Sequence, residues 1–185
     1  MVSYTLTIEQ TGGSGIVVPG HGFLLNNELT DFNPAPLAPG VPDPNLPAPG
    51  KRPRSSMSPT IVLAHGRPVV ALGSPGGATI ITTVLQVLVE HLDRGRSLPA
   101  AIATPRASQR NSDPGDAEPA FLATPEAAAL QALGEQLRVA PTTPPLPPEI
   151  GAATAIAFLG GGLLQAAAEP ERRGGGSALV VHPRH

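Results

Sequence analysis

The stretch VVALGSPGGATIITTVLQVLVEHLDRG, residues 69–95, changes its hydrophobic period halfway along. It opens with a short apolar run, residues 69–72, that glycine and proline terminate, which is typical of a buried strand. From Ala78 to Gly95 the apolar residues recur every three to four positions, which predicts an amphipathic helix in spite of the β-branched content. The repeating positions are Ile80, Ile81, Val84, Leu85, Leu88 and Leu92. A strand followed directly by a helix indicates a fold that mixes both elements.

Other short apolar runs predict further strands. Residues 2–9 alternate strictly, with apolar side chains on one face and Ser3, Thr5, Thr7 and Glu9 on the other, as in a half-buried strand. The remaining predicted strands are residues 15–18, 23–25 and 60–63 and, near the end of the chain, 153–159, 163–169 and 178–182.

A second helix is predicted to begin after Thr124. Thr124 can cap it, Pro125 suits its first position, and Glu126 complements the helix dipole. Leu130, Leu133 and Leu137 would then form its apolar stripe.

Composition narrows the class of protein. The chain has 185 residues, a net charge of −2, 14% charged residues and no cysteine, which indicates one domain without disulfides and no nucleic-acid partner. The first residues lack the basic and apolar regions of a signal peptide, and no apolar run is long enough to span a bilayer. Half of the 24 prolines fall in two segments, 33–50 and 141–148, which are expected to be extended connections.

The glycine pair in GSPGG suits the binding of an anion. If the helix begins near Ala78, the amides of Gly76 and Gly77 lie at its N-terminus, where N–H groups and the helix dipole favour negative charge. Two such amides can form an oxyanion hole, although the motif by itself is also compatible with a plain strand–turn–helix connection.

Two polar motifs admit a functional and a structural interpretation. Ser55 and Ser56, in RPRSSMSPT, can donate hydrogen bonds to a carboxylate or can cap a turn. Glu28 and Asp31, in NNELTDF, can bind an ammonium group or can belong to a surface turn. The five histidines show no ligand spacing, so neither a metal nor a cofactor is expected.

Taken together, these motifs resemble the small subunit of the gamma-glutamyltransferases, also called gamma-glutamyltranspeptidases or glutathione hydrolases, of the N-terminal-nucleophile hydrolase superfamily. The resemblance runs from residue 2 to about residue 182. It is carried by YTLTIEQTGGSGIVVPGHGFLLNNELTDF, KRPRSSMSPTIVL, ALGSPGGATIITTVLQVL, PRASQRN, GAATAIAFL and AAAEPERRGGG. It implies an α+β fold: part of an αββα four-layer sandwich, with residues 1–185 as one small-subunit-like domain.

The resemblance also implies roles for the candidate residues. Ser55 and Ser56 match the serines that hold the α-carboxylate of a γ-glutamyl group, and Glu28 and Asp31 match the residues that hold its α-ammonium. Gly76 and Gly77 match the oxyanion donors, and Thr5 matches a threonine that hydrogen-bonds the nucleophile. Thr7 stands where the family often has an asparagine that contacts the substrate amine.

The implied activity is γ-glutamyl transfer from glutathione to an amino acid, a peptide or water. The resemblance implies that the nucleophilic threonine, its strand and the large subunit lie outside this chain, so we expect the chain to be inactive without that missing N-terminal portion. The alternatives are a non-catalytic fragment that needs a partner chain and an amidase like the cephalosporin acylases. Family members are often periplasmic or secreted, which leaves the compartment of this protein open.

Overall fold

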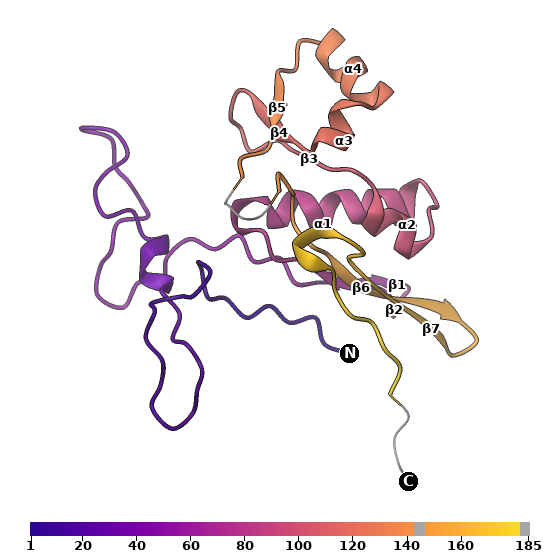
Figure 1. Ribbon diagram of the computed structural model, residues 1–185, viewed down its shortest axis with the longest axis horizontal. Helices are drawn as coiled ribbons and strands as arrows, with labels where there is room; N and C mark the ends of the chain where they lie inside the picture. Colours follow the sequence, from indigo (N-terminus) through magenta and orange to yellow (C-terminus); the bar gives the residue numbers. More distant parts are fainter. Residues whose placement is uncertain (143–146, 182–185) are drawn as a thin grey trace. The chain divides into compact units, whose positions relative to one another are not determined.

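The computed structural model describes residues 1–142 and 147–181 (Figure 1). Its contacts divide the chain into two compact units. The first comprises Met1–Thr5 and Ser58–His185, and the second comprises Leu6–Met57.

The first unit is built on a four-stranded antiparallel sheet. Its strands are β1 (Thr60–Ala64), β2 (Arg67–Gly73), β6 (Thr154–Gly160) and β7 (Leu163–Ala168), in the order β1-β2-β6-β7. The central pair joins segments that are distant in the sequence, with Val70 opposite Ala157 and Leu72 opposite Ala155. All four strands were expected from their apolar runs, and these predictions are confirmed.

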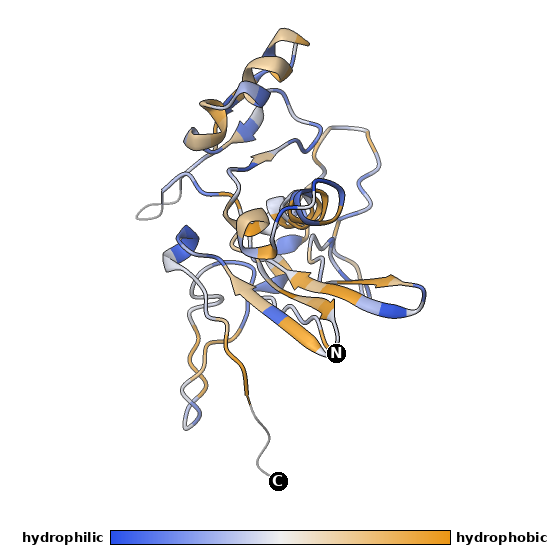
Figure 2. Ribbon diagram, turned by 90° about the vertical axis from the view of Figure 1, so that its right-hand side faces the viewer, coloured by the Kyte–Doolittle hydropathy of each residue, from blue (hydrophilic) through white to orange (hydrophobic). Residues whose placement is uncertain are grey.

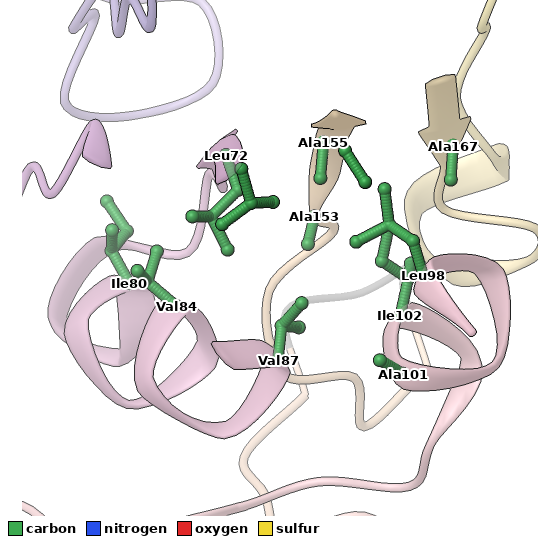
Figure 3. Packing of buried hydrophobic residues seen from close by; sticks show 12 residues of the cluster. Leu72, Ile80, Val84, Val87, Leu98, Ala101, Ile102, Ala153, Ala155 and Ala167 are labelled. Carbon is green, nitrogen blue, oxygen red and sulfur yellow. The ribbon is translucent and has the colours of Figure 1, made fainter. Parts of the chain in front are cut away.

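A helical layer covers one face of this sheet. It begins with the 3-10 turn η2 (Gly77–Thr79), continues through α1 (Ile80–Leu88) into the π-helical turn η3 (Val89–Asp93), and is completed by α2 (Leu98–Ala103). Figure 3 shows the core between the two layers, in which leucine, isoleucine and valine side chains of the helices meet small side chains of the sheet. The sheet contributes Ala155, Ala157 and Ala167 to this core, with Val70 and Leu72 of β2, and Ala153 joins them just before β6. Alanine at these positions brings the helices close to the sheet, so a core can form without large aromatic residues.

The opposite face of the sheet is apolar and largely exposed. Strand register places Ile61, Ala71, Ile156 and Ala166 in one row across the four strands, on the side away from the helices. Ile61 and Ile156 are about two-fifths exposed, and Leu63 and Leu164 are more exposed still. The strands are correspondingly coloured as largely hydrophobic in Figure 2. An apolar sheet face of this kind is usually covered by another layer.

A smaller sheet contains β3 (Ala107–Ser108), β4 (Gly115–Ala117) and β5 (Leu137–Val139). The helices α3 (Pro119–Leu122) and α4 (Pro125–Ala132) connect β4 to β5. Thr124 caps α4 as predicted, because its Oγ1 accepts a hydrogen bond from the amide of Ala127. The predicted leucine stripe is wrong. Leu133 is 86% exposed, Leu137 belongs to β5, and the buried residue of α4 is Ala127.

Four of the predicted strands do not form among the described residues. Residues 2–9 show the expected alternation with inverted exposure: Val2, Tyr4 and Leu6 are exposed, and the polar residues between them are half-buried. Residues 15–18 and 23–25 are reduced to one isolated bridge between Val17 and Leu24. In the last predicted strand, residues 178–181 are irregular, and His182 lies outside the described residues.

The second unit, Leu6–Met57, contains little regular structure apart from that bridge and the 3-10 helix η1 (Glu28–Asp31). Its segment 33–50 forms turns around Asp43, whose carboxylate accepts hydrogen bonds from the side chain of Asn33 and from the amides of Leu37 and Asn45. These hydrogen bonds from Asn33 and Asn45 lower the pKa of Asp43.

A buried network of four charged side chains ties the first unit together. Glu118 accepts two hydrogen bonds from Arg172, at 2.6 and 2.7 Å, and two more from the amides of Arg106 and Ile150. Glu169 bridges Arg106 and Arg172 at 2.9 and 2.8 Å. Each of the four side chains is therefore paired, which a buried charge requires. The 3-10 turn η4 (Arg172–Gly174) positions Arg172 in this network.

Replacing Glu118 by glutamine should lower the free energy of unfolding by about 3–5 kcal/mol. The change removes one of the two carboxylates that pair with the buried Arg172 and leaves Glu169 alone to balance two buried guanidinium groups. Equilibrium urea unfolding would measure the difference. Glu171→Gln is the matched control, since Glu171 is exposed and stands between two members of the network. Equal losses in the two variants would contradict the prediction.

The same substitution should alter the dependence of stability on pH. Burial opposes ionisation of Glu118, but Arg172 and the amides of Ile150 and Arg106 outweigh it and hold the pKa of Glu118 below its ordinary value of 4.5. This stabilisation is present above pH 4.5 and is lost as the pH falls through the lower, folded-state pKa. Below pH 4.5, the stability of Glu118→Gln should therefore fall less steeply than that of the parent.

Candidate functional site

The GSPGG loop places both candidate oxyanion donors at the start of the helical layer. Gly76 precedes η2 and Gly77 begins it, and η2 leads directly into α1. Gly76 has φ 146° and Gly77 has φ 53°, in the region where glycine is favoured. The side chain and the amide of Thr79 both donate to the carbonyl of Gly76, at 2.9 and 3.1 Å. The loop therefore has the strand–turn–helix form that the sequence predicted.

Two residues that the sequence analysis did not single out hold this loop. Ser74 Oγ accepts a hydrogen bond from the amide of Ala152 and donates one to the carbonyl of Pro75. Gly151 packs so closely that a Cβ atom there would lie 2.5 Å from Thr83 Oγ1 and 2.8 Å from Ser74 Oγ. The sequence signal for this packing is Gly151 in GAATAIAFL, and the sequence alone gives no reason to connect that glycine with the GSPGG loop.

Thr5 lies beside the strand that leads into the loop. A Cβ atom on Gly73 would be 3.8 Å from Thr5 Oγ1, and Ser3 Oγ donates to the carbonyl of Leu72. Within the first unit, the hydroxyl of Thr5 is thus placed next to the end of β2.

A cavity of about 240 Å³ adjoins Gly76 and Thr79. Arg110 and Asp116 line it and form an ion pair at 2.7 Å, and Arg138 pairs with the other oxygen of Asp116. Burial favours the neutral acid, but the two guanidinium groups hold the pKa of Asp116 below its ordinary value. Both carboxylate oxygens of Asp116 are therefore paired.

In the second unit, η1 brings Glu28 and Asp31 together. Burial and the neighbouring Glu28 carboxyl raise the pKa of Asp31, and the charge of Arg54 partly offsets them. Thr7 Oγ1 donates to Glu28 Oε2 at 2.8 Å. A half-buried pair of carboxyl groups that repel each other is well suited to bind a cation, because the cation removes the repulsion.

The serine pair lies in the same unit and has no regular secondary structure. Ser55 is exposed, and its Oγ accepts a hydrogen bond from the amide of Met57, which leaves its O–H able to donate. Ser56 is half-buried. Five of the eight candidate residues, Thr7, Glu28, Asp31, Ser55 and Ser56, thus belong to Leu6–Met57, while Thr5, Gly76 and Gly77 belong to the other unit.

Across residues 1–142 and 147–181, the side chains of His, Asp and Glu form no group of three or more that could hold a metal ion. Within the same residues, no helix combines the length and apolar character needed to cross a membrane.

An antiparallel sheet with helices on one face and a glycine turn leading into the first helix agrees with the N-terminal-nucleophile hydrolase fold that the resemblance implies. The solved gamma-glutamyltranspeptidase from Pseudomonas nitroreducens complexed with L-DON is similar over 98% of this chain and 93% of that chain, with a TM-score of 0.81 and 36% sequence identity. A family match to gamma-glutamyltranspeptidase covers residues 1–179. The chain belongs to the gamma-glutamyltranspeptidase family, which confirms the resemblance found in the sequence.

Two further similarities define the extent of the match. The "Glutathione hydrolase proenzyme" of Bacillus subtilis (strain 168) is 52% identical over 106 residues, which are 57% of this chain and 17% of that protein. The match thus spans about a sixth of the length of this curated relative. The solved cephalosporin acylase from Bacillus halodurans has a TM-score of 0.73 and 27% identity, covering 92% of this chain and 30% of that one.

Replacing Gly151 by alanine should displace the GSPGG loop, because the new Cβ would overlap Thr83 and Ser74 and the residue has φ +67°. Overpacking of this kind costs about 1–3 kcal/mol of stability. The amide resonances of Gly76 and Gly77 should shift in ¹⁵N-correlated NMR spectra. Gly161→Ala is the control, since Gly161 also has positive φ but faces open space. Unmoved resonances in the Gly151 variant would contradict the prediction.

Proposed function

We propose that the protein containing this chain transfers γ-glutamyl groups from glutathione and related compounds to an amino acid, a peptide or water. The observation that carries the proposal is the Glu28–Asp31 pair in a member of this family, since its two carboxyl groups suit an α-ammonium. Ser55 and Ser56 supply hydroxyl donors of the kind that an α-carboxylate needs. An α-amino acid group carries both charges.

The proposed chemistry is acyl transfer through a covalent intermediate. The hydroxyl of a threonine with a free α-amine, outside this chain, attacks the γ-carbonyl carbon, and its proton passes through that amine to the leaving group. Gly76 and Gly77 stabilise the oxyanion of the tetrahedral intermediate, and Thr5 hydrogen-bonds the nucleophile. The resulting γ-glutamyl ester is then attacked by the acceptor amine or by water.

Thr7 takes an indirect role in this proposal. Its hydrogen is donated to Glu28 Oε2, and its oxygen lies 3.3 Å from the amide of Glu9. Thr7 therefore positions the Glu28 carboxylate, whereas the asparagine usual in the family contacts the substrate amine itself.

The exposed apolar face of the four-stranded sheet supports the proposal that a large subunit packs against this chain. Ile61, Ile156 and Ala166, which lie in one row with the buried Ala71, present an exposed surface that a second sheet can cover, as in the four-layer sandwich. The N-terminal portion of the complete protein is the proposed occupant, and the chain without it is proposed to be inactive.

Two alternatives remain distinct from this proposal. The similarity to a cephalosporin acylase favours amide hydrolysis of another acyl group. The Glu28–Asp31 pair argues against it, because such an acyl group need not carry an ammonium. A non-catalytic fragment is the other alternative, and it predicts no turnover under any condition.

The direct test is to join residues 1–185 to the N-terminal portion of the Bacillus subtilis relative. The chimera should release p-nitroaniline from γ-glutamyl-p-nitroanilide, and residues 1–185 alone should not, because the nucleophile is supplied by the added portion. Failure of a folded, self-processed chimera to turn over this substrate would contradict the proposal. Turnover of glutaryl-p-nitroanilide at an equal rate would favour the acylase alternative.

In that chimera, Asp31→Asn should raise KM for γ-glutamyl-p-nitroanilide by at least tenfold, since a charge-assisted hydrogen bond contributes about 1.5–3 kcal/mol. The value of kcat should change much less, because the ammonium is bound in the ground state and in the transition state alike. Asp93→Asn, which changes an exposed carboxylate outside the candidate site, serves as the comparison. A KM within about threefold of the parent, less than 1 kcal/mol, would leave Asp31 without a binding role.

The pH dependence of KM provides a second check on the pair. Binding an ammonium favours ionised Asp31, so KM should rise as the pH falls through the raised pKa of Asp31. Glu28→Gln removes the neighbouring negative charge, so the rise in KM should occur at lower pH in this variant.

A further inference from the structure

The side chain of Asn45 connects the two halves of the candidate substrate site. Its Nδ2 donates to the carbonyl of Asp31 at 2.7 Å, and its Oδ1 accepts from the amide of Arg54 at 2.9 Å. Asp31 belongs to the carboxyl pair, and Arg54 directly precedes Ser55 and Ser56. One amide group thus joins two segments that lie 23 positions apart in the sequence.

Asn45 is itself held in place by its surroundings. Its amide donates to Asp43 Oδ1 at 2.8 Å, and its carbonyl accepts from the amide of Asn33 at 3.0 Å. Asn33 is buried, and its side chain donates to the other oxygen of Asp43 at 2.7 Å. The proline-rich segment 33–50 therefore contains a fixed hydrogen-bonded turn centred on Asp43 and Asn45.

We propose that Asn45 is a positioning residue that sets the spacing between the ammonium-binding pair, Glu28 and Asp31, and the carboxylate-binding serines. This inference rests on the proposed function. The two charged groups of an α-amino acid are attached to one carbon, so both halves of the site must meet them at a separation of a few ångströms. Neither half belongs to a long helix or strand, so hydrogen bonds such as those of Asn45 must hold the separation.

A positioning residue of this kind should affect only ligands that contact both halves of the site. A ligand that contacts only one half of the site has no need of a set spacing, whereas a ligand that contacts both gains affinity from preorganisation. Loss of Asn45 should therefore weaken a two-group ligand and leave one-group ligands almost unchanged.

The test uses three probes against the 185-residue chain, with dissociation constants from ¹⁵N-correlated NMR titrations. L-Glutamate carries both groups, glutarate lacks the ammonium, and 4-aminobutanoate lacks the α-carboxylate. The variants are Asn45→Ala, which removes both hydrogen bonds, and Asn45→Asp, which keeps an acceptor for Arg54 but loses the donor to Asp31. Lys51→Gln is the matched control, because Lys51 Nζ bonds the carbonyl of Leu46 in the same segment and contacts neither half.

The parent and Lys51→Gln should bind L-glutamate at least about tenfold more tightly than either one-group probe, as expected for two linked contacts. Asn45→Ala should lose most of this advantage while its affinities for glutarate and 4-aminobutanoate stay within about twofold of the parent, since each single half survives. Asn45→Asp should lose part of the preference for L-glutamate.

Other results overturn the inference in distinguishable ways. If both Asn45 variants keep the full preference for L-glutamate, Asn45 does not set the spacing, and the proposed function is untouched. If either variant weakens all three probes equally, its role is general stability of the segment. If the parent shows no preference for L-glutamate, the two halves do not act as one site in this chain, and the inference about Asn45 is overturned. The proposed function is decided separately, by turnover of the chimera.

Discussion

The placement of the candidate oxyanion loop depends on the buried network of Arg106, Glu118, Glu169 and Arg172. Arg106 donates to the carbonyl of Ile150, and the amide of Ile150 donates to Glu118. The next two residues are Gly151, which packs against Ser74, and Ala152, whose amide donates to Ser74. A continuous set of hydrogen bonds and close contacts therefore runs from the ion network to the GSPGG loop. Removing these four charges from water is costly, and their mutual pairing offsets that cost.

The second unit is organised by different means. Leu6–Met57 contributes Phe32 to the buried apolar residues, and its turns are held mainly by polar side chains. Asp43, Asn45 and Asn27 each make several of these hydrogen bonds. A segment stabilised this way keeps polar side chains at fixed places, which suits recognition of a charged substrate. It is also more sensitive to single substitutions at the hydrogen-bonding residues than a segment with a large apolar core.

The sequence predicts single helices and strands well. It predicts poorly the contacts between residues that are far apart in the sequence. The change of period at GSPGG was enough to locate β2 and α1, and Thr124 with Pro125 was enough to locate the start of α4. The alternation in residues 2–9 revealed two unlike faces, but a strand also needs a paired neighbour, which no local pattern reports. Leucine spacing failed at Leu137 because the chain had already turned into β5. Arg106 and Glu169 are 63 positions apart, so their pairing leaves no periodic signal in the sequence. The role proposed for Asn45 could not be predicted either, because the proline-rich composition of segment 33–50 indicates only an extended connection.

The strand order has a consequence for the way the chain acquires its structure. The central pair of the large sheet joins β2, which ends at Gly73, to β6, which begins at Thr154. Closing a loop of that length costs conformational entropy before any contact compensates it, and folds dominated by such distant pairings form slowly. During synthesis, α1 can form early, but its apolar side has no complete sheet to pack on until nearly the whole chain has emerged. We therefore expect the apolar side of α1 to stay exposed until β6 has been synthesised and paired with β2.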